Sequence, residues 1–211
     1  IVRSIHEGLR TEFGLELGLA DTTTWGEMAD RMHDFDIPEG IAPQQSFVQI
    51  LDPATGTGTF LVEVIQQIHG TMVTKWQGEG IAVQEITRLW NDYVPKHLLP
   101  RLHGYELMMA PYAIAHLKIS LKLHETGYKF ESEERARVYL TNTLELPSKE
   151  QLTLDFLPAM AHEVQAVNEI KRNLKFTVII GNPPYSVSSS NKSEIRNNYF
   201  IRFFYIYCFQ S

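Results

Sequence analysis

The stretch Phe47-Val48-Gln49-Ile50-Leu51-Asp52-Pro53-Ala54-Thr55-Gly56-Thr57-Gly58-Thr59-Phe60 decides the fold of this chain. Its first five residues, apolar except for Gln49, predict a buried strand, and the loop that follows contains Gly56 and Gly58. A helix is predicted next, from about residue 60 to residue 72. Strand, glycine loop and helix in this order form the first unit of a nucleotide-binding α/β fold, in which the helix amino terminus offers free N–H groups to a ligand.

The residues missing from this loop restrict its ligand. The dinucleotide fingerprint requires a third glycine where this chain has Leu61, and the Gly-Lys-Ser/Thr sequence of phosphate-binding loops is absent. The loop begins instead with Asp52, which would repel phosphates but could hold a cation directly or through water. S-adenosylmethionine, a sulfonium compound with an amino-acid tail, meets this description. Asp52 could equally be a cap that closes the loop at the strand end.

Two further strands are predicted, each followed by a polar side chain. Residues 102–106 end in Glu106, and in mononucleotide-binding folds an acid at this point can accept both ribose hydroxyls. Its separation from the first glycine exceeds the usual ~20 residues because a helical region is inserted. Residues 137–140 form the next strand, and the amide of Asn142 behind it could bond the adenine edge of a cofactor. The alternatives are a solvated acid at Glu106 and a turn-forming asparagine at Asn142.

Helical periodicity predicts three apolar stripes that pack on the core. The first belongs to a short helix that ends near Gly14, the second to the inserted region at residues 67–99, and the third to a helix at residues 109–124. We assign no catalytic role to the second stripe. In chain order the stripes consist of Ile5, Leu9 and Phe13; of Ile81, Val83, Ile86, Leu89, Trp90 and Tyr93; and of Ala113, Leu117, Ile119 and Leu121.

A last strand is predicted at residues 176–180, and it stops at the corner Asn182-Pro183-Pro184-Tyr185. Its continuously apolar, β-branched sequence favours a central parallel strand that is covered on both faces. Since the prolines lack N–H donors, the strand ends here, and Asn182 and Tyr185 would project from the carboxyl end of the sheet, where ligands bind. An amide beside a flat phenol ring suits a planar heterocycle with an amino group, such as adenine. An ordinary turn or a proline-rich partner motif is the alternative.

The composition sets the context of these motifs. The chain has 211 residues, of which 44% are hydrophobic and 21% charged, as in an ordinary globular protein. Its single cysteine, Cys208, excludes an intrachain disulfide and a thiolate metal cluster, and fits a reducing, intracellular setting. The net charge of -6 argues against a chain that holds DNA by bulk electrostatics. No apolar stretch reaches the length of a membrane span, and neither end carries a helix cap or stop signal, so we expect a piece of a longer polypeptide.

The loop motif at residues 52–60 and the corner at residues 182–185 together resemble the amino-group DNA methyltransferases, specifically the adenine enzymes. The chain start and the inserted helices are similar to the methyltransferase part of large single-chain restriction-modification enzymes. The resemblance implies a Rossmann-like S-adenosylmethionine-dependent methyltransferase fold, an α/β fold with a mostly parallel sheet flanked by helices, here truncated at both ends. We divide the chain into a partial N-terminal helical segment, residues 1–46, and an incomplete catalytic core, residues 47–211.

The resemblance also implies a role for each motif. The glycine loop would wrap S-adenosylmethionine, Glu106 would bind its ribose, and Asn142 would contact its adenine. Asn182 and the Pro183 carbonyl would accept hydrogen bonds from the amino group of the target adenine, and Tyr185 would stack on this base after it is flipped out of the duplex. The predicted catalytic residues are Asn182, Pro183, Pro184 and Tyr185, and the predicted cofactor-binding residues are Asp52, Ala54, Thr55, Gly56, Gly58, Phe60, Glu106, Leu107, Asn142 and Thr143.

The sequence therefore predicts an adenine-specific DNA methyltransferase core with S-adenosylmethionine as cofactor, part of a restriction-modification protein of the prokaryotic cytoplasm. Its partner would be double-stranded DNA, held mainly through regions outside this segment, to which helicase, nuclease and target-recognition domains could be fused. No membrane partner is predicted. Two alternatives stay open: methylation of RNA or of a protein glutamine amide, because glutamine methyltransferases share Asn-Pro-Pro-Tyr, and a non-catalytic scaffold that binds DNA or partner subunits.

Overall fold

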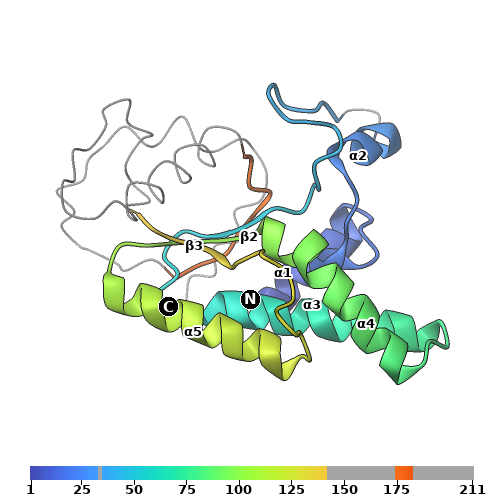
Figure 1. The fold of residues 1–211 in the computed structure, drawn as a ribbon. Helices are drawn as coiled ribbons and strands as arrows, with labels where there is room; N and C mark the ends of the chain where they lie inside the picture. The colour runs from blue at the N-terminus through green and yellow to red at the C-terminus, as the bar shows by residue number, and fades with distance from the viewer. Residues whose placement is uncertain (33–34, 142–173, 183–211) are drawn as a thin grey trace.

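The computed structural model describes residues 1–32, 35–141 and 174–182 of the chain. The centre of the described part is a sheet with the strand order β3-β2-β1-β4 (Figure 1). All neighbouring strands run parallel, so their carboxyl ends lie at the same edge. This confirms the predicted α/β fold with a mostly parallel sheet. The strands are β1 (Ile50–Asp52), β2 (Leu102–Glu106), β3 (Arg137–Leu140) and β4 (Val178–Ile179).

Two long helices, α3 (Thr59–Gly78) and α5 (Met109–Glu125), lie side by side along one face of the sheet (Figure 1). Because side chains alternate along a strand, each strand contributes every second residue to this face. The residues concerned form one buried core with the helices, which includes Ile50, Leu102, Val138 and Val178 from the strands and Leu61, Ile65, Ala115 and Ile119 from the helices. A second, smaller cluster consists of Leu51, Tyr105 and Tyr139, with Phe176 packed against it.

The N-terminal segment packs on the same core. Leu15, Leu19 and Trp25 are buried in one cluster with the strands and with α3. Helix α2 begins at a capping box, in which the Thr24 hydroxyl accepts the Glu27 N–H and the Glu27 carboxylate accepts the Thr24 N–H at 2.7 Å. The elements of this segment are α1 (Val2–Glu12), the 3-10 turn η1 (Gly18–Ala20) and α2 (Trp25–Arg31).

A buried guanidinium joins this segment to the inserted helices. Arg101 is only 1% exposed and donates to the carbonyl oxygens of His97 and Asp21 and to the Tyr93 hydroxyl. The Tyr93 hydroxyl in turn donates to the Ala20 carbonyl at 2.7 Å. The buried guanidinium thus finds hydrogen-bond acceptors in both the N-terminal segment and the inserted helices. The inserted elements are α4 (Val83–Tyr93), the π-helical turn η2 (Val94–Leu98) and the 3-10 turn η3 (Leu99–Arg101), which leads directly into β2.

The predicted strands at residues 102–106 and 137–140 are confirmed with these bounds, and two others differ. β1 begins later than predicted because the backbone of Gln49 bonds Thr177, whose hydroxyl accepts the Gln49 N–H at 2.9 Å. The prediction of a central strand at residues 176–180 is wrong for the sheet that the structure describes. There β4 lies at the edge, and Ile179 is 36% exposed, so the strand is not covered on both faces.

The predicted stripes are confirmed at Ile5, Leu9, Ile86, Trp90, Tyr93 and Ile119, which are buried. They are wrong at four positions: Val83 is 70%, Leu117 60% and Leu121 53% exposed, and Ala113 is exposed as well. Helix α5 turns Ala115, Ile119 and Leu123 to the core instead. Among the described helices, none combines the length and the apolar character that crossing a membrane requires.

Candidate active site

The sheet topology brings the two sequence motifs to one edge. β1 and β4 are neighbours, with Leu51 opposite Ile179, and the Ile180 N–H donates to the Leu51 carbonyl at 2.9 Å. The loop that begins at Asp52 and the corner at Asn182 therefore leave adjacent strands at the same carboxyl edge. On the other side of β1, β2 delivers Glu106 to this edge. In an open α/β sheet this is the edge where ligands bind.

The glycine loop folds back over the end of β2. Gly56 and Gly58 both have positive φ angles, 54° and 79°, which side chains other than glycine rarely adopt. Gly58 stands at the amino cap of α3, and its N–H donates to the Thr55 carbonyl at 2.9 Å. The Thr55 N–H donates to the Tyr105 carbonyl at 3.0 Å, so the loop is bonded to the strand beside it.

Glu106 binds this loop from the end of β2. Its Oε2 accepts the Gly56 N–H at 2.8 Å, and its Oε1 accepts the N–H groups of Leu107 and Met108 at 2.9 and 2.8 Å. The side chain is 9% exposed. A carboxylate offers about four acceptor positions, so one position on Oε2 is left for a hydroxyl.

Asp52 is a buried acid at this edge, and its pKa is strongly raised. The residue is fully buried, its Oδ1 accepts the Ala54 N–H at 3.1 Å, and its Oδ2 has no hydrogen-bond partner among the described residues. Burial raises the pKa of Asp52 from its ordinary value of 3.8 to about 7, since the Ala54 N–H offsets it only in part and the charge of Glu106 adds to it. The site therefore holds two neighbouring acids, one of which changes its charge near neutral pH.

Gly181, the residue before Asn182, lies directly against this carboxyl group. A Cβ placed on Gly181 would lie 2.9 Å from Asp52 Oδ1 and 3.2 Å from Pro53 Cδ. Only a residue without a side chain fits at position 181. The next residue, Asn182, is exposed and therefore lies beside the start of the glycine loop. The two predicted motifs, 129 positions apart for Asp52 and Gly181, thus border one another.

The structure brings together most of the predicted cofactor residues that it describes: Asp52, Ala54, Thr55, Gly56, Gly58 and Glu106. Leu107 lies at the rim and is 66% exposed, whereas Phe60 is partly buried against the core. Asn182 is the one predicted catalytic residue within the described ranges. Pro183, Pro184, Tyr185, Asn142 and Thr143 lie outside the described residues.

Two residues at the site, Gly104 and Gly181, were not among the predicted site residues. Gly104 lies in β2 beneath Thr55, and a glycine inside a strand is a known sign of close backbone approach. His103 is fully buried, and burial lowers its pKa to about 3. It is therefore uncharged, and its ring packs against Phe176 at 5.2 Å.

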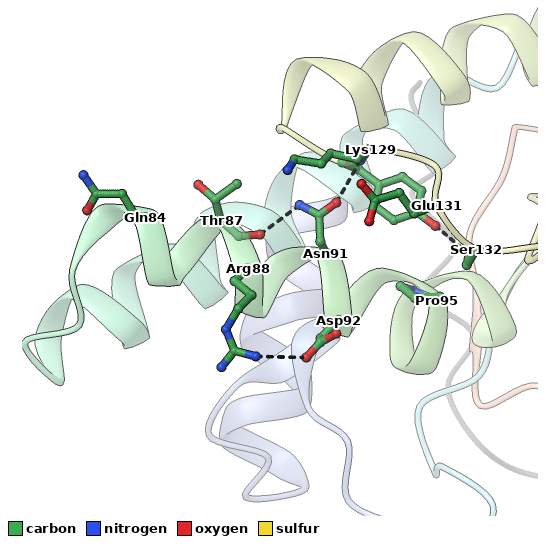
Figure 2. A pocket seen from close by; sticks show the side chains of 10 residues that line it. Gln84, Thr87, Arg88, Asn91, Asp92, Pro95, Lys129, Glu131 and Ser132 are labelled. Carbon is green, nitrogen blue, oxygen red and sulfur yellow. Dashed lines mark hydrogen bonds and ion pairs between the residues drawn. The ribbon is translucent and has the colours of Figure 1, made fainter.

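Figure 2 shows a polar hollow of about 370 Å³ that lies elsewhere. Asn91 is at its centre, donating to the Thr87 carbonyl and accepting the Lys129 N–H, each at 2.8 Å. Because α5 starts at the carboxyl edge of the sheet, its far end and the residues behind it, such as Lys129, belong to the opposite edge. The hollow shares no residue with the site described above.

Comparisons with known proteins match the chain to a DNA-methyltransferase domain family and to restriction-modification enzymes. The family described as "MmeI, DNA-methyltransferase domain" matches residues 41–204. The structure is similar to that of a nuclease-deletion mutant of the Type ISP restriction-modification enzyme LlaGI in complex with a DNA substrate mimic. The identity is 27% and the TM-score 0.56, over 95% of this chain and 13% of that one. No curated protein matches the chain.

Two other solved structures are similar. The ATP-dependent Type ISP restriction-modification enzyme LlaBIII bound to DNA is 26% identical with a TM-score of 0.55, over 90% of this chain and 10% of that one. The DrdV–DNA complex is 24% identical with a TM-score of 0.50, over 90% of this chain and 13% of that one, which shows the fold alone. The chain thus spans 10% to 13% of the length of these three proteins.

Proposed function

The chain belongs to the DNA-methyltransferase domain family of MmeI, and from this premise we propose that it transfers a methyl group from S-adenosylmethionine to the exocyclic amino group of adenine in DNA. The protein would act in restriction-modification, as the similar Type ISP enzymes do. Double-stranded DNA would be its partner, gripped mainly by other regions, because this chain carries a net charge of -6.

One observation carries the proposal: the glycine loop lies directly against Gly181, the residue that leads into the Asn182 corner. Gly181 approaches the Asp52 carboxyl group so closely that no side chain fits between them. A methyl donor held by the loop and an amine held by the corner would therefore meet at one edge of the sheet. Bringing two reactants together in this way lowers the barrier of a bimolecular reaction substantially.

The loop residues fit the chemical groups of S-adenosylmethionine. The buried Oδ2 of Asp52, which has no hydrogen-bond partner among the described residues, is an acceptor that an ammonium group can use. The free position on Glu106 Oε2 suits a ribose hydroxyl, and the exposed Leu107 offers an apolar surface for an adenine ring. When bound, the cofactor supplies an electrophilic methyl group on a sulfonium.

Asn182 would act on the amine. An exocyclic amine is a poor nucleophile because its lone pair is delocalised into the ring. The amide oxygen of Asn182 can accept a hydrogen bond from such an amine, which favours a tetrahedral nitrogen and a directed lone pair. This role requires positioning and local electrostatics and no strong base. His103 does not compete for such a role, since it is buried in the core.

The test is methyl transfer by the protein and by its Asn182→Ala variant, with duplex DNA and S-adenosylmethionine radiolabelled in the methyl group. We expect the variant to lose at least about a hundredfold in rate, since one hydrogen-bonding group at a reacting centre contributes on this scale. Asn182 is exposed, so the variant should unfold at the same temperature as the wild type. Asn91→Ala, at the opposite edge of the sheet, is the matched control and should keep its rate.

Mass spectrometry of the digested DNA then identifies the methylated base. Label in N6-methyladenine supports the proposal. Label in cytosine, in RNA or in a protein glutamine would reject the adenine assignment. A wild-type protein that binds no S-adenosylmethionine would favour the non-catalytic scaffold instead.

A further inference from the structure

Thr55 and Gly104 are in unusually close contact. A Cβ placed on Gly104 would lie 2.5 Å from Thr55 Oγ1 and 3.3 Å from Thr55 Cγ2, and 3.0 Å from Leu61 Cδ1. Cβ atoms do not tolerate a neighbour at 2.5 Å. The glycine loop therefore lies on β2 at a point where the strand has no side chain.

Thr55 cannot simply turn away from such a side chain. It is only 4% exposed, its N–H donates to the Tyr105 carbonyl at 3.0 Å, and its hydroxyl donates to the Asp52 carbonyl at 3.1 Å. Its own carbonyl accepts the Gly58 N–H at 2.9 Å. Both the backbone and the side chain are fixed, so a larger residue at position 104 has to move the loop as a whole.

The position of the loop determines what it can bind. The 2.8 Å hydrogen bond from the Gly56 N–H to Glu106 Oε2 exists only while the loop lies this close to β2. Lifting the loop would break this bond and would also shift Asp52, which is linked to Thr55 through its carbonyl group. The two acids assigned to the cofactor would then lose their relative placement.

We propose that Gly104 is a positioning residue for the cofactor: it makes no contact with the ligand itself, but by accommodating Thr55 it sets the height of the glycine loop above β2. This inference rests on the proposed function for the identity of the ligand. The placement of the loop is a property of the protein and can be measured without a ligand.

The first measurement is hydrogen–deuterium exchange of the protein without cofactor. Gly104→Ala should speed the exchange of the backbone amides of Thr55 and Gly56, whose bonds to Tyr105 and Glu106 depend on the close contact. Gly70→Ala is the matched control, because this glycine is exposed on α3 with nothing within 4 Å of a Cβ. Unchanged exchange in Gly104→Ala would overturn the inference.

The second measurement is S-adenosylmethionine affinity by isothermal titration. Forcing one extra carbon into this contact should weaken binding by about tenfold or more, whereas Gly70→Ala should bind as the wild type does. Equal affinity of Gly104→Ala and wild type would overturn the inference. If the wild type itself bound no cofactor, the proposed function would fail, and the exchange result would still decide whether Gly104 places the loop.

A rescue experiment separates positioning from general damage to the fold. Thr55→Ala removes both atoms of Thr55 that a residue at position 104 would meet, and Leu61 Cδ1 is the end of a flexible side chain that can shift. Gly104→Ala should therefore weaken binding about tenfold in the wild-type background but less than about twofold in the Thr55→Ala background. The same loss in both backgrounds would show that Gly104 acts in some other way.

Discussion

Replacing Asp52 by asparagine removes a buried charge and keeps the shape of the side chain. The amide oxygen can still accept the Ala54 N–H, and the amide nitrogen takes the place of Oδ2, which has no partner in the described part of the chain. We expect the free energy of unfolding of the Asp52→Asn variant, relative to that of the wild type, to increase as the pH rises. We also expect the variant to bind S-adenosylmethionine less well.

The sign follows from the raised pKa. Burial raises the pKa of Asp52 to about 7 in the folded protein from its ordinary value of 3.8, so between these values the folded state holds a proton that the unfolded state has released. Wherever the folded state binds more protons, the free energy of unfolding falls with rising pH. The contribution of Asp52 is therefore most favourable below about pH 4, is lost progressively up to about pH 7, and stays constant above.

The magnitude follows from the same two values. Each pH unit within this range removes about 1.4 kcal/mol, which amounts to about 4 kcal/mol over the full interval and about 2 to 3 kcal/mol between about pH 5 and about pH 8. The asparagine does not titrate. Its amide nitrogen has no acceptor among the described residues, which costs about 1 to 3 kcal/mol at any pH, so this cost cancels when the two pH values are compared.

The assay is urea unfolding of both proteins at about pH 5 and about pH 8. The difference in unfolding free energy, variant minus wild type, should rise by about 2 to 3 kcal/mol between the two conditions. The same substitution at Asp30, which is exposed on α2, controls for the removal of one carboxylate from the chain. A variant-minus-wild-type difference that stays constant with pH would mean that Asp52 is ionised throughout, and would refute the reasoning.

Two further predictions concern Glu106 and the cap of α2. Glu106→Gln keeps the size of the side chain but replaces one of the two acceptor oxygens that bind Gly56, Leu107 and Met108. The affinity for S-adenosylmethionine, measured by calorimetry, should therefore fall about tenfold to a hundredfold. Unchanged affinity would contradict this prediction. Thr24→Ala removes the capping box and should lower the free energy of urea unfolding by about 1 kcal/mol. The methyl-transfer rate should not change, and a loss of rate would mean that α2 contributes to the site.

The sequence predicted those elements whose ends carry strong signals. The strand at residues 102–106 lies between a proline-containing turn and an acid, and the helix that starts at the glycine loop begins where the free N–H groups were expected. The helix at residues 109–124 was placed correctly, but its buried face was not. Its sequence is apolar on several sides, so periodicity placed Ile119 correctly but could not decide whether Leu117 and Leu121 or Ala115 and Leu123 face the core beside it.

The composition of the site was predictable, and its internal bonding was not. The pattern of residues identified Asp52 and Glu106 as acids at strand ends. That Glu106 bonds Gly56, 50 positions away, depends on the pairing of β1 with β2, and the contact of Gly181 with Asp52 depends on the pairing of β1 with β4. Strand order is a property of the whole sheet, which no local pattern encodes.

The burial and protonation of Asp52 indicate whether this residue serves the stability of the fold or the binding of a ligand. This buried carboxyl group has one oxygen without a partner in ranges 1–32, 35–141 and 174–182, and it lies beside a second acid, which lowers stability at neutral pH. An asparagine or serine would cap the same loop without a charge. A cation placed at Oδ2 would reverse this effect, because an opposite charge at short range favours the ionised form. Binding should then release up to about one proton per cofactor near pH 7, which calorimetry in buffers of different ionisation enthalpy detects. Binding without proton release would mean that the cofactor's ammonium group lies elsewhere, and that Asp52 serves only to close the loop.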